Sequence, residues 1–295
     1  MNAVAFWGAI ETGVLYGFLS LGVYLSFRVL KFPDLTVDGS FPLGAAVAAT
    51  LITQNLPPLL ATLAAALCGA LAGLCTAVLS VQFKILNLLA SILTMIALYS
   101  INLRIMGKPN LPLLNQPTVF DGLGGLPDWL VLLVGLGLTK LVIDYLLTSE
   151  LGLAIRATGM NPVMANAQGI FTDRFILLGM ALSNSLAAVA GALFAQVNGF
   201  ADVTLGVGTV VAGLATVILG EAIFPSGTVR QATLAVIAGS LVYRVAIALA
   251  LNADFLGFRA QDLNLVTAIL VVLALVLPNA KATIRTSMQA WGKRS

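Results

Sequence analysis

Histidine is absent from the 295 residues of the chain, and charged residues make up only 9% of it. The first absence excludes histidine-based catalysis and histidine-ligated metal sites. No GxxxxGK[ST] loop occurs, so the chain lacks the phosphate cradle that it would need to hydrolyse ATP by itself. A GxSxG elbow, HExxH and CxxC are missing too. A membrane-embedded enzyme would therefore have no catalytic constellation, and we expect no catalytic residue, metal or cofactor in this chain.

The scarcity of charge leaves most of the protein surface to lipid. Hydrophobic residues make up 59% of the chain and the mean hydropathy is +1.02, whereas a soluble domain carries about 25% charged residues. The apolar runs are continuous rather than alternating, which favours helices over a β-barrel. We therefore expect an all-α polytopic membrane protein. No cation precedes Arg28, so the first helix is not expected to be a cleaved signal.

Nine hydrophobic segments can be marked, and eight or nine of them are expected to be transmembrane or re-entrant helices. They cover residues 5–27, 39–54, 58–81, 85–106, 128–147, 175–197, 204–222, 229–250 and 263–277. A plain span needs about 20 apolar residues, so the short, glycine-rich second and seventh segments are expected to be broken or re-entrant. We interpret residues 1–295 as one transmembrane domain. Its parts are a first half at about 5–147, a polar loop at 148–174, a second half at about 175–280 and a tail at 281–295.

The cations set the predicted orientation, because cytoplasmic loops carry an excess of lysine and arginine. If nine segments cross, one side receives Arg28, Lys31, Lys84, Arg156, Arg174, Arg230, Lys281, Arg285, Lys293 and Arg294. That side is the cytoplasm, so the N-terminus is predicted outside and the C-terminus inside. The proline- and glycine-rich loop 107–127 is then external, and its composition suits an ordered, turn-rich lid.

One polar stretch in the first half has a faint copy in the second. FPDLTVDGSFPLGAAVAATL at 32–51 and FADVTLGVGTVVAGLATVIL at 200–219 both begin F-x-D-x-T, and each opens a short segment after a full helix. The two preceding helices run in opposite senses in the predicted topology. That is the pattern of a weak inverted repeat, whose interrupted segments point to a solute pathway. An ordinary helix start, with Asp or Thr as N-cap, is the alternative for each copy.

Carboxylates at membrane depth need an environment other than lipid. A charge at the bilayer centre costs about 2.5–3.5 kcal/mol on the insertion scale, of which a helix N-terminus offsets about 0.3–1 kcal/mol. These acids are therefore expected to face a water-filled path or the protein interior. We predict a solute pathway lined by Asp34, Thr36, Asp38, Ser40, Asn184, Asp202 and Thr204.

A second polar stretch, SELGLAIRATGMNPVMANAQGIFTDR, covers 149–174 and is cytoplasmic by charge. Helix-forming residues surround Arg156, and the run is interrupted between Gly159 and Asn161. A second short helix at 162–168 would end at Gly169. The pattern predicts a short helix lying under the membrane, followed by a turn and another short helix.

This stretch resembles the coupling segment of ABC-importer permeases of the branched-chain amino acid, ribose and autoinducer class. Their G-x-A-x-R-A…N…A…G-I pattern is matched by Gly152, Ala154, Arg156, Ala157, Asn161, Ala165, Gly169 and Ile170. The resemblance implies an ATPase-coupling set formed by Gly152, Arg156, Ala157, Gly159, Asn161, Ala165 and Gly169. Arg156 is the strongest single candidate for a charged contact with the ATPase, and the alternative is a snorkelling surface arginine.

Two further motifs follow the order found in that class, and the resemblance covers about residues 10–280. The class carries G-x-x-x-x-G and then D-L-S-V-G-S at the head of its second core helix. The chain has Gly17, Gly22 and DLTVDGS at 34–40, with Asp38 inserted between Val and Gly. Leu-Gly-Glu at 219–221 resembles the Leu-Gly-Gly of the class, from which Glu221 departs. The TVDGS variant resembles the subgroup linked to uptake of aromatic amino acids.

The resemblance implies a type II-like ABC-importer permease in a bacterial inner membrane. Such a subunit works as a homodimer surrounded by membrane lipid, with two cytoplasmic ATPases that hold the ATP and Mg²⁺. An external binding protein or lipoprotein delivers the solute, here an amino acid that could be aromatic. A nucleic-acid partner is not expected. The alternative function is an ion-coupled secondary transporter, which is supported by the weak inverted repeat and by the buried acids.

Several polar residues in apolar segments are candidates for function or for helix–helix contacts. They are Glu11, Asn87, Asn102, Asn184 and Arg244. Glu221 ends the seventh segment and is a candidate for a position near a gate. Lys140 and Asp144 have the i,i+4 spacing of an ion pair within one helix. Gly69 and Gly73 form a GxxxG pair suited to close helix packing.

Overall fold

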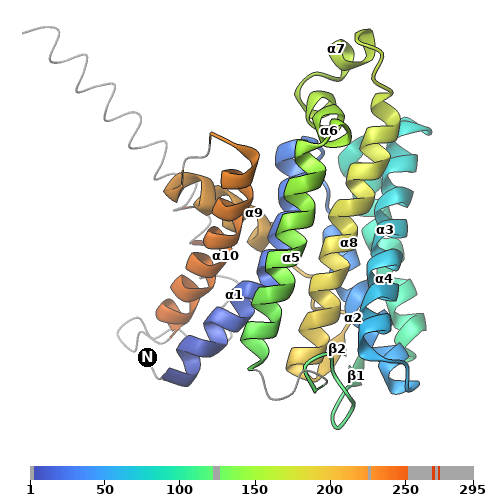
Figure 1. Cartoon of the computed structure of the whole chain (residues 1–295). Helices are drawn as coiled ribbons and strands as arrows, with labels where there is room; N and C mark the ends of the chain where they lie inside the picture. Colours follow the sequence, from blue (N-terminus) through green and yellow to red (C-terminus); the bar gives the residue numbers. More distant parts are fainter. Residues whose placement is uncertain (1–2, 122–126, 225–226, 252–267, 270–271, 273–295) are drawn as a thin grey trace, which may run out of the picture.

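The computed structural model describes residues 3–121, 127–224, 227–251, 268–269 and 272 of the chain. Helices dominate this part and lie side by side in a bundle (Figure 1). The elements are, in chain order, α1 (Ala3–Val23), η1 (Tyr24–Val29), α2 (Val37–Thr53), α3 (Pro58–Val81), α4 (Asn87–Met106), β1 (Asn110–Pro112), α5 (Asp128–Thr148), α6 (Glu150–Met160), α7 (Pro162–Ala167), α8 (Thr172–Asn198), β2 (Phe200–Asp202), α9 (Thr209–Ile223) and α10 (Val229–Leu251).

Six helices in the described ranges are long and apolar enough to cross a membrane. They are α1 with its continuation η1, then α3, α4, α5, α8 and α10. The helices α2 and α9 correspond to the short second and seventh segments and have only 17 and 15 residues, each forming one continuous helix. That these segments are re-entrant stays a prediction. The predicted segment at 263–277 lies almost entirely outside the described residues.

The helix α1 is largely buried in the bundle, whereas α3, α4 and α5 are mostly exposed. Leu15, Leu19 and Leu21 on α1 are fully buried in the main apolar core. Large apolar side chains on α3, α4 and α5 are exposed, for example Leu67, Ile96 and Val142. In water such a surface would be unfavourable, whereas in a bilayer it faces acyl chains. The burial pattern therefore fits a polytopic membrane protein.

Glycines allow α8 to pack closely against two other helices. A Cβ added at Gly69 or Gly73 of α3 would clash with the α8 backbone, and a Cβ at Gly191 of α8 would clash with α2. The predicted GxxxG pair is therefore used for close packing, and its partner is a helix of the same chain.

The two ends of the bundle differ. The helices α6 and α7 lie at one end, called here the α6–α7 end, and strands β1 and β2 lie at the other, the ribbon end (Figure 1). The strands pair antiparallel, with Asn110 opposite Asp202 and Pro112 opposite Phe200. The predicted turn-rich lid at 107–127 thus contains a strand that the sequence analysis missed, because its partner lies 90 residues away.

The predicted i,i+4 pair on α5 is confirmed and ties this helix to α10. Lys140 Nζ lies 2.5 Å from Asp144 Oδ2, and both side chains are largely buried. The Thr233 hydroxyl of α10 donates a hydrogen bond of 2.6 Å to Asp144 Oδ1. A buried carboxylate with a charged partner on one side and a hydroxyl on the other fixes the spacing of two helices in the bundle.

Candidate functional site

The two short helices start inside the bundle, and one carboxylate joins their N-terminal ends. Asp38 lies in the first turn of α2, but its side chain caps α9. Its Oδ1 accepts hydrogen bonds from the Thr209 hydroxyl at 2.8 Å and the Val210 amide at 2.7 Å, and its Oδ2 accepts one from the Gly208 amide at 3.3 Å. A carboxylate at a helix N-terminus satisfies amides that have no intrahelical partner and interacts favourably with the helix dipole.

The remaining polar residues of the first motif form a buried network. Asp34 Oδ1 accepts a hydrogen bond of 2.9 Å from the Thr36 amide, and Asp34 Oδ2 accepts one of 2.7 Å from Asn184 Nδ2 on α8. The Ser40 hydroxyl donates to Asn184 Oδ1 at 2.7 Å. The Thr36 hydroxyl shares a hydrogen bond of 2.7 Å with that of Thr76 on α3. All five side chains are fully buried, so the network joins α2, α3 and α8.

The faint repeat in the sequence corresponds to a repeated turn in the structure. Asp202 Oδ1 accepts a hydrogen bond of 2.8 Å from the Thr204 amide, as Asp34 Oδ1 does from Thr36. Each turn follows a long helix and precedes a short one, and the long helices α1 and α8 run in opposite directions (Figure 1). The two copies differ in exposure, because Asp34 is fully buried while Thr204 is exposed.

Asp202 links the two strands at the ribbon end through its hydrogen bonds. Its Oδ2 accepts a hydrogen bond of 3.1 Å from Asn110 Nδ2 on the opposite strand, and its Oδ1 accepts one of 2.6 Å from the Thr204 hydroxyl. Partial burial acts to raise the pKa of Asp202, but the hydrogen bonds from Thr204 and Asn110 favour the charged form, and the pKa lies below its ordinary value.

A cavity of about 400 Å³ lies between the tip of α2, the middle of α4 and the segment that precedes α9. Asp38, Tyr99, Ser100 and Asn102 contribute its polar side chains. The Asn102 side chain is fully buried; its Nδ2 donates to the Gly39 carbonyl at 3.3 Å, while its Oδ1 has no hydrogen-bond partner among the described residues. Of the seven residues predicted to line a pathway, Asp38 borders this cavity, whereas the other six do not. Their assignment to the pathway stays a prediction.

The predicted turn between two short helices is present at the α6–α7 end. The helix α6 ends at Met160, and Asn161 caps α7 by accepting a hydrogen bond of 3.1 Å from the Met164 amide. Gly169 follows with a φ of 82°. Gly159 presses against η1, since an added Cβ would clash with the Val29 carbonyl and approach Leu30 Cα to 2.9 Å. The segment is thus held against the end of the first span.

The outer surface of this segment is apolar and exposed. Leu153, Met160, Val163 and Met164 each have more than half of their side chain accessible. Within the predicted coupling set, Gly152, Gly159 and Ala165 are buried, Arg156 and Ala157 are half-buried, and Asn161 and Gly169 are exposed. The buried members therefore fix the segment to the bundle, while its surface is provided by neighbouring apolar residues that the sequence motif does not include.

An ion pair joins η1 to α9 at the same end. Arg28 Nε donates to both carboxylate oxygens of Glu221, at 2.8 and 3.0 Å, and a terminal guanidinium nitrogen of Arg28 contacts Glu221 as well. The two residues are 193 positions apart. Glu221 thus departs from the Leu-Gly-Gly pattern by providing a partner for Arg28. The sequence analysis named Glu221 but missed the pair, as it also missed Thr76 and Thr209, because nothing local links residues so distant along the chain.

These features define a polytopic α-helical membrane protein with two short helices that begin inside the bundle. The chain belongs to the family described as branched-chain amino acid transport system / permease component, whose model matches residues 8–277. This family membership confirms the resemblance found in the sequence.

Two named relatives show the range of the family around this chain. It is 39% identical to the tyrosine transport system permease protein of Clostridioides difficile over 272 residues, which cover 92% of this chain and 90% of that protein. It is 26% identical to the ribose import permease protein RbsC of Escherichia coli K12 over 259 residues, which cover 84% of this chain and 77% of that protein. An uncharacterized protein of Rickettsia prowazekii is 36% identical over 272 residues. No solved structure matched the chain.

Proposed function

We propose that this chain is the membrane subunit of an ATP-driven importer that carries an amino acid, with an aromatic one as first candidate. It works as a homodimer with two cytoplasmic ATPases and an external binding protein, and its α6–α7 end faces the cytoplasm. Family membership supports the transport role, and the name of the tyrosine permease supports the solute class. The absence of a nucleotide-binding loop from the whole sequence means that a partner must hydrolyse ATP.

The observation that carries the proposal is the construction of the α6–α7 segment. Its buried glycines hold it rigidly on the bundle, whereas Met160, Val163 and Met164 are exposed at its outer surface. An exposed apolar patch at the polar end of a membrane protein marks a surface for a protein partner. The ATPase docks on this patch, and the half-buried Arg156 provides a charged contact beside it.

A continuous set of contacts leads from this surface to the short helices α2 and α9. Gly159 of α6 contacts Val29 at the end of η1, and Arg28 on η1 pairs with Glu221 near the end of α9. The other end of α9 is capped by Asp38 of α2. Movement of the docked ATPases is transmitted along these contacts and separates or joins the tips of α2 and α9, which gives alternating access to a path between them.

Uptake in proteoliposomes tests the proposed function. The chain is reconstituted with its partner ATPase and binding protein, and uptake of radiolabelled tyrosine is measured with ATP, with a non-hydrolysable analogue and with ionophores. ATP-dependent uptake that ionophores leave intact supports the proposal. Uptake by the chain alone, driven by an ion gradient and abolished by ionophores, would instead assign it to the ion-coupled secondary transporters.

A matched pair of substitutions tests the docking surface. We expect Met164→Asp to reduce co-purification of the ATPase at least tenfold, since it places a charge in the centre of an apolar contact. The control is Leu114→Asp, because Leu114 is 77% exposed and lies just after β1 at the ribbon end. Equal retention of the ATPase by Met164→Asp and wild-type protein would place the docking surface elsewhere.

A further inference from the structure

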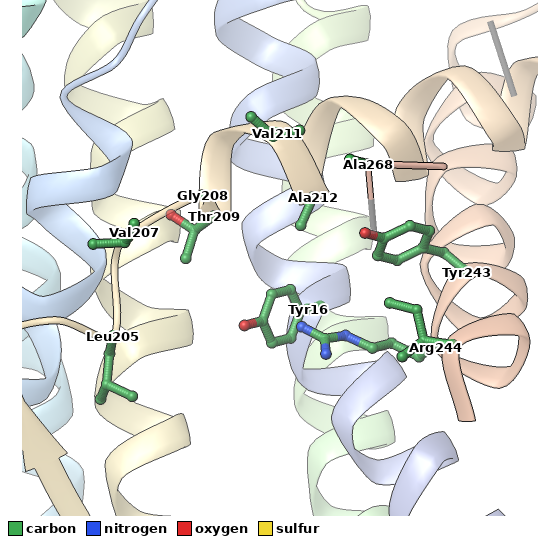
Figure 2. Close-up of a pocket in the computed structure, with 11 residues that line it drawn as sticks. Tyr16, Leu205, Val207, Gly208, Thr209, Val211, Ala212, Tyr243, Arg244 and Ala268 are labelled. Atoms are coloured by element: carbon green, nitrogen blue, oxygen red, sulfur yellow. The ribbon is translucent and has the colours of Figure 1, made fainter. Parts of the chain in front are cut away.

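A second cavity, of about 260 Å³, lies between α1, the N-terminal end of α9 and α10 (Figure 2). Its walls are mostly apolar and include Leu205, Val207, Val211, Ala212 and Ile247. Its polar groups come from Tyr16, Thr209, Tyr243 and Arg244. The volume is slightly below the range of about 300–1,000 Å³ found for sites of drug-sized ligands, so the cavity suits a small solute.

Arg244 brings a permanent positive charge into this cavity. Figure 2 shows its guanidinium beside the Tyr16 ring, and the guanidinium carbon lies 3.5 Å from the ring centroid. The ring covers one face of the guanidinium and leaves its N–H edges for other partners. Arg244 Nε is buried and has no hydrogen-bond partner in the described part of the chain, where no carboxylate lies within 4.0 Å of the guanidinium either.

The part of the fold that the structure describes pairs this charge with no carboxylate. An arginine at membrane depth is costly without a partner, and such residues mark solute or ion pathways. The nearby N-terminus of α9 offers Arg244 no acceptor, because its free groups are donors and are bonded to Asp38. Arg28 and Lys140, by contrast, are each paired with a carboxylate of the protein. Among the described residues, the Arg244 cation therefore lies on an aromatic ring and its Nε has no acceptor, which suits it to bind an anion.

We propose that Arg244, supported by Tyr16, binds the carboxylate of the transported solute in this cavity. A guanidinium pairs with a carboxylate through two parallel N–H···O bonds, and the apolar walls accommodate a hydrophobic side chain. The solute class is therefore a small carboxylate with an apolar or aromatic body, which includes aromatic and branched amino acids but excludes neutral sugars. The inference rests on the proposed transport function and extends it to a binding site within the permease.

Direct binding to the purified chain in nanodiscs tests the proposal without the ATPase or the binding protein. The probes are tyrosine and tyramine, which is tyrosine without its carboxylate. We expect wild-type protein to bind tyrosine at least tenfold more tightly than tyramine. The Arg244→Gln variant should bind tyrosine about 10- to 100-fold more weakly, as expected for loss of hydrogen bonds to a charged group, while its affinity for tyramine stays unchanged.

Three further variants separate binding from folding. Arg230→Gln makes the same change at an exposed position of α10 and should leave tyrosine affinity unchanged. Tyr16→Phe keeps the ring and should retain binding, whereas Tyr16→Leu removes the platform and should weaken binding. Arg244→Lys keeps the charge but loses the planar fork, so its affinity should lie between those of wild type and Arg244→Gln. Melting temperatures of all variants are measured alongside.

Several outcomes would overturn the inference. These are an absence of tyrosine binding to the wild-type chain, equal affinity of wild type and Arg244→Gln for tyrosine, or equal affinity of wild type for tyrosine and tyramine. Arg244-dependent enrichment of phosphatidylglycerol over phosphatidylcholine, without tyrosine binding, would assign the guanidinium to a lipid phosphate. The binding site and the proposed function can fail independently. ATP-driven tyrosine uptake that persists in Arg244→Gln would refute this site but leave the importer assignment standing.

Discussion

At the scale of single residues, Asp38 shows how one side chain can organise two helices. The sequence marks it as an addition to the D-L-S-V-G-S pattern, and that pattern gives no role to the added position. In the structure its carboxylate accepts three hydrogen bonds from the start of α9 while its backbone belongs to the first turn of α2. The addition therefore joins the N-terminal ends of the two short helices.

Replacing Asp38 should destabilise this junction. Loss of an N-cap costs about 0.5–2 kcal/mol, and Asp38→Ala also leaves the Val210 amide and the Thr209 hydroxyl without their acceptor. We expect a lower melting temperature in detergent and a loss of solute uptake. The control is Asp128→Ala, an exposed acid in the first turn of α5 whose side chain makes no hydrogen bond to any residue that the structure describes. Equal melting temperatures for the two variants would contradict the capping role.

The neighbouring carboxylate Asp34 shows where sequence reasoning reaches its limit. The cost of a charge at membrane depth correctly requires a polar environment, but it does not distinguish a water-filled path from a hydrogen-bonded interior. Asp34 is fully buried, with the Thr36 amide and Asn184 as donors. That distinction depends on Asn184, 150 positions away, which local patterns cannot bring next to Asp34.

At the scale of elements, the hydrophobic segments could be predicted well because the bilayer itself sets their length. Six predicted spans correspond to helices of 20 or more residues, and the two short segments correspond to α2 and α9. Strands β1 and β2 could not be predicted. They have three residues each, and their stability comes from pairing across a long stretch of sequence.

The contact between α6 and η1 leaves no room for a side chain at Gly159. A Cβ there would clash with the Val29 carbonyl, so Gly159→Ala should shift α6 away from the end of the first span. We expect the assembled transporter to keep its ATPase activity but lose most of its ATP-driven uptake, since the docking segment no longer moves η1. ATP hydrolysis and uptake are measured on the same proteoliposomes.

The control for that substitution is a glycine at which an added Cβ would contact no other atom. Gly137 on α5 has no atom within 4 Å of an added Cβ, so Gly137→Ala should leave both activities unchanged and could raise helix stability slightly. If Gly159→Ala keeps the wild-type ratio of uptake to ATP hydrolysis, the α6–η1 contact does not transmit movement. A parallel loss of ATP hydrolysis and uptake would point to failed docking instead.

At the scale of the whole molecule, three of the polar contacts between the two halves of the chain bear on the proposed movement. Asp38 contacts the start of α9, Asn184 contacts Asp34, and Arg28 contacts Glu221. The first two contacts are inside the bundle, whereas the third lies at the α6–α7 end and is partly exposed, with 55% of the Arg28 side chain and 26% of the Glu221 side chain accessible. An exposed ion pair contributes little to stability, so its position suggests a role in holding one conformation.

Charge reversal tests this role, because it separates attraction between the two side chains from their individual presence. Arg28→Glu places two carboxylates together and Glu221→Arg places two guanidinium groups together, so each single variant should push η1 and α9 apart and lower uptake strongly. The double variant restores opposite charges across the same gap and should recover at least half of the wild-type uptake. Melting temperatures should change little, since a partly exposed pair contributes about 0–1 kcal/mol. If the double variant is no better than the worse single one, the pair does not connect the proposed docking segment to α9, and movement must reach the short helices through the buried contacts alone.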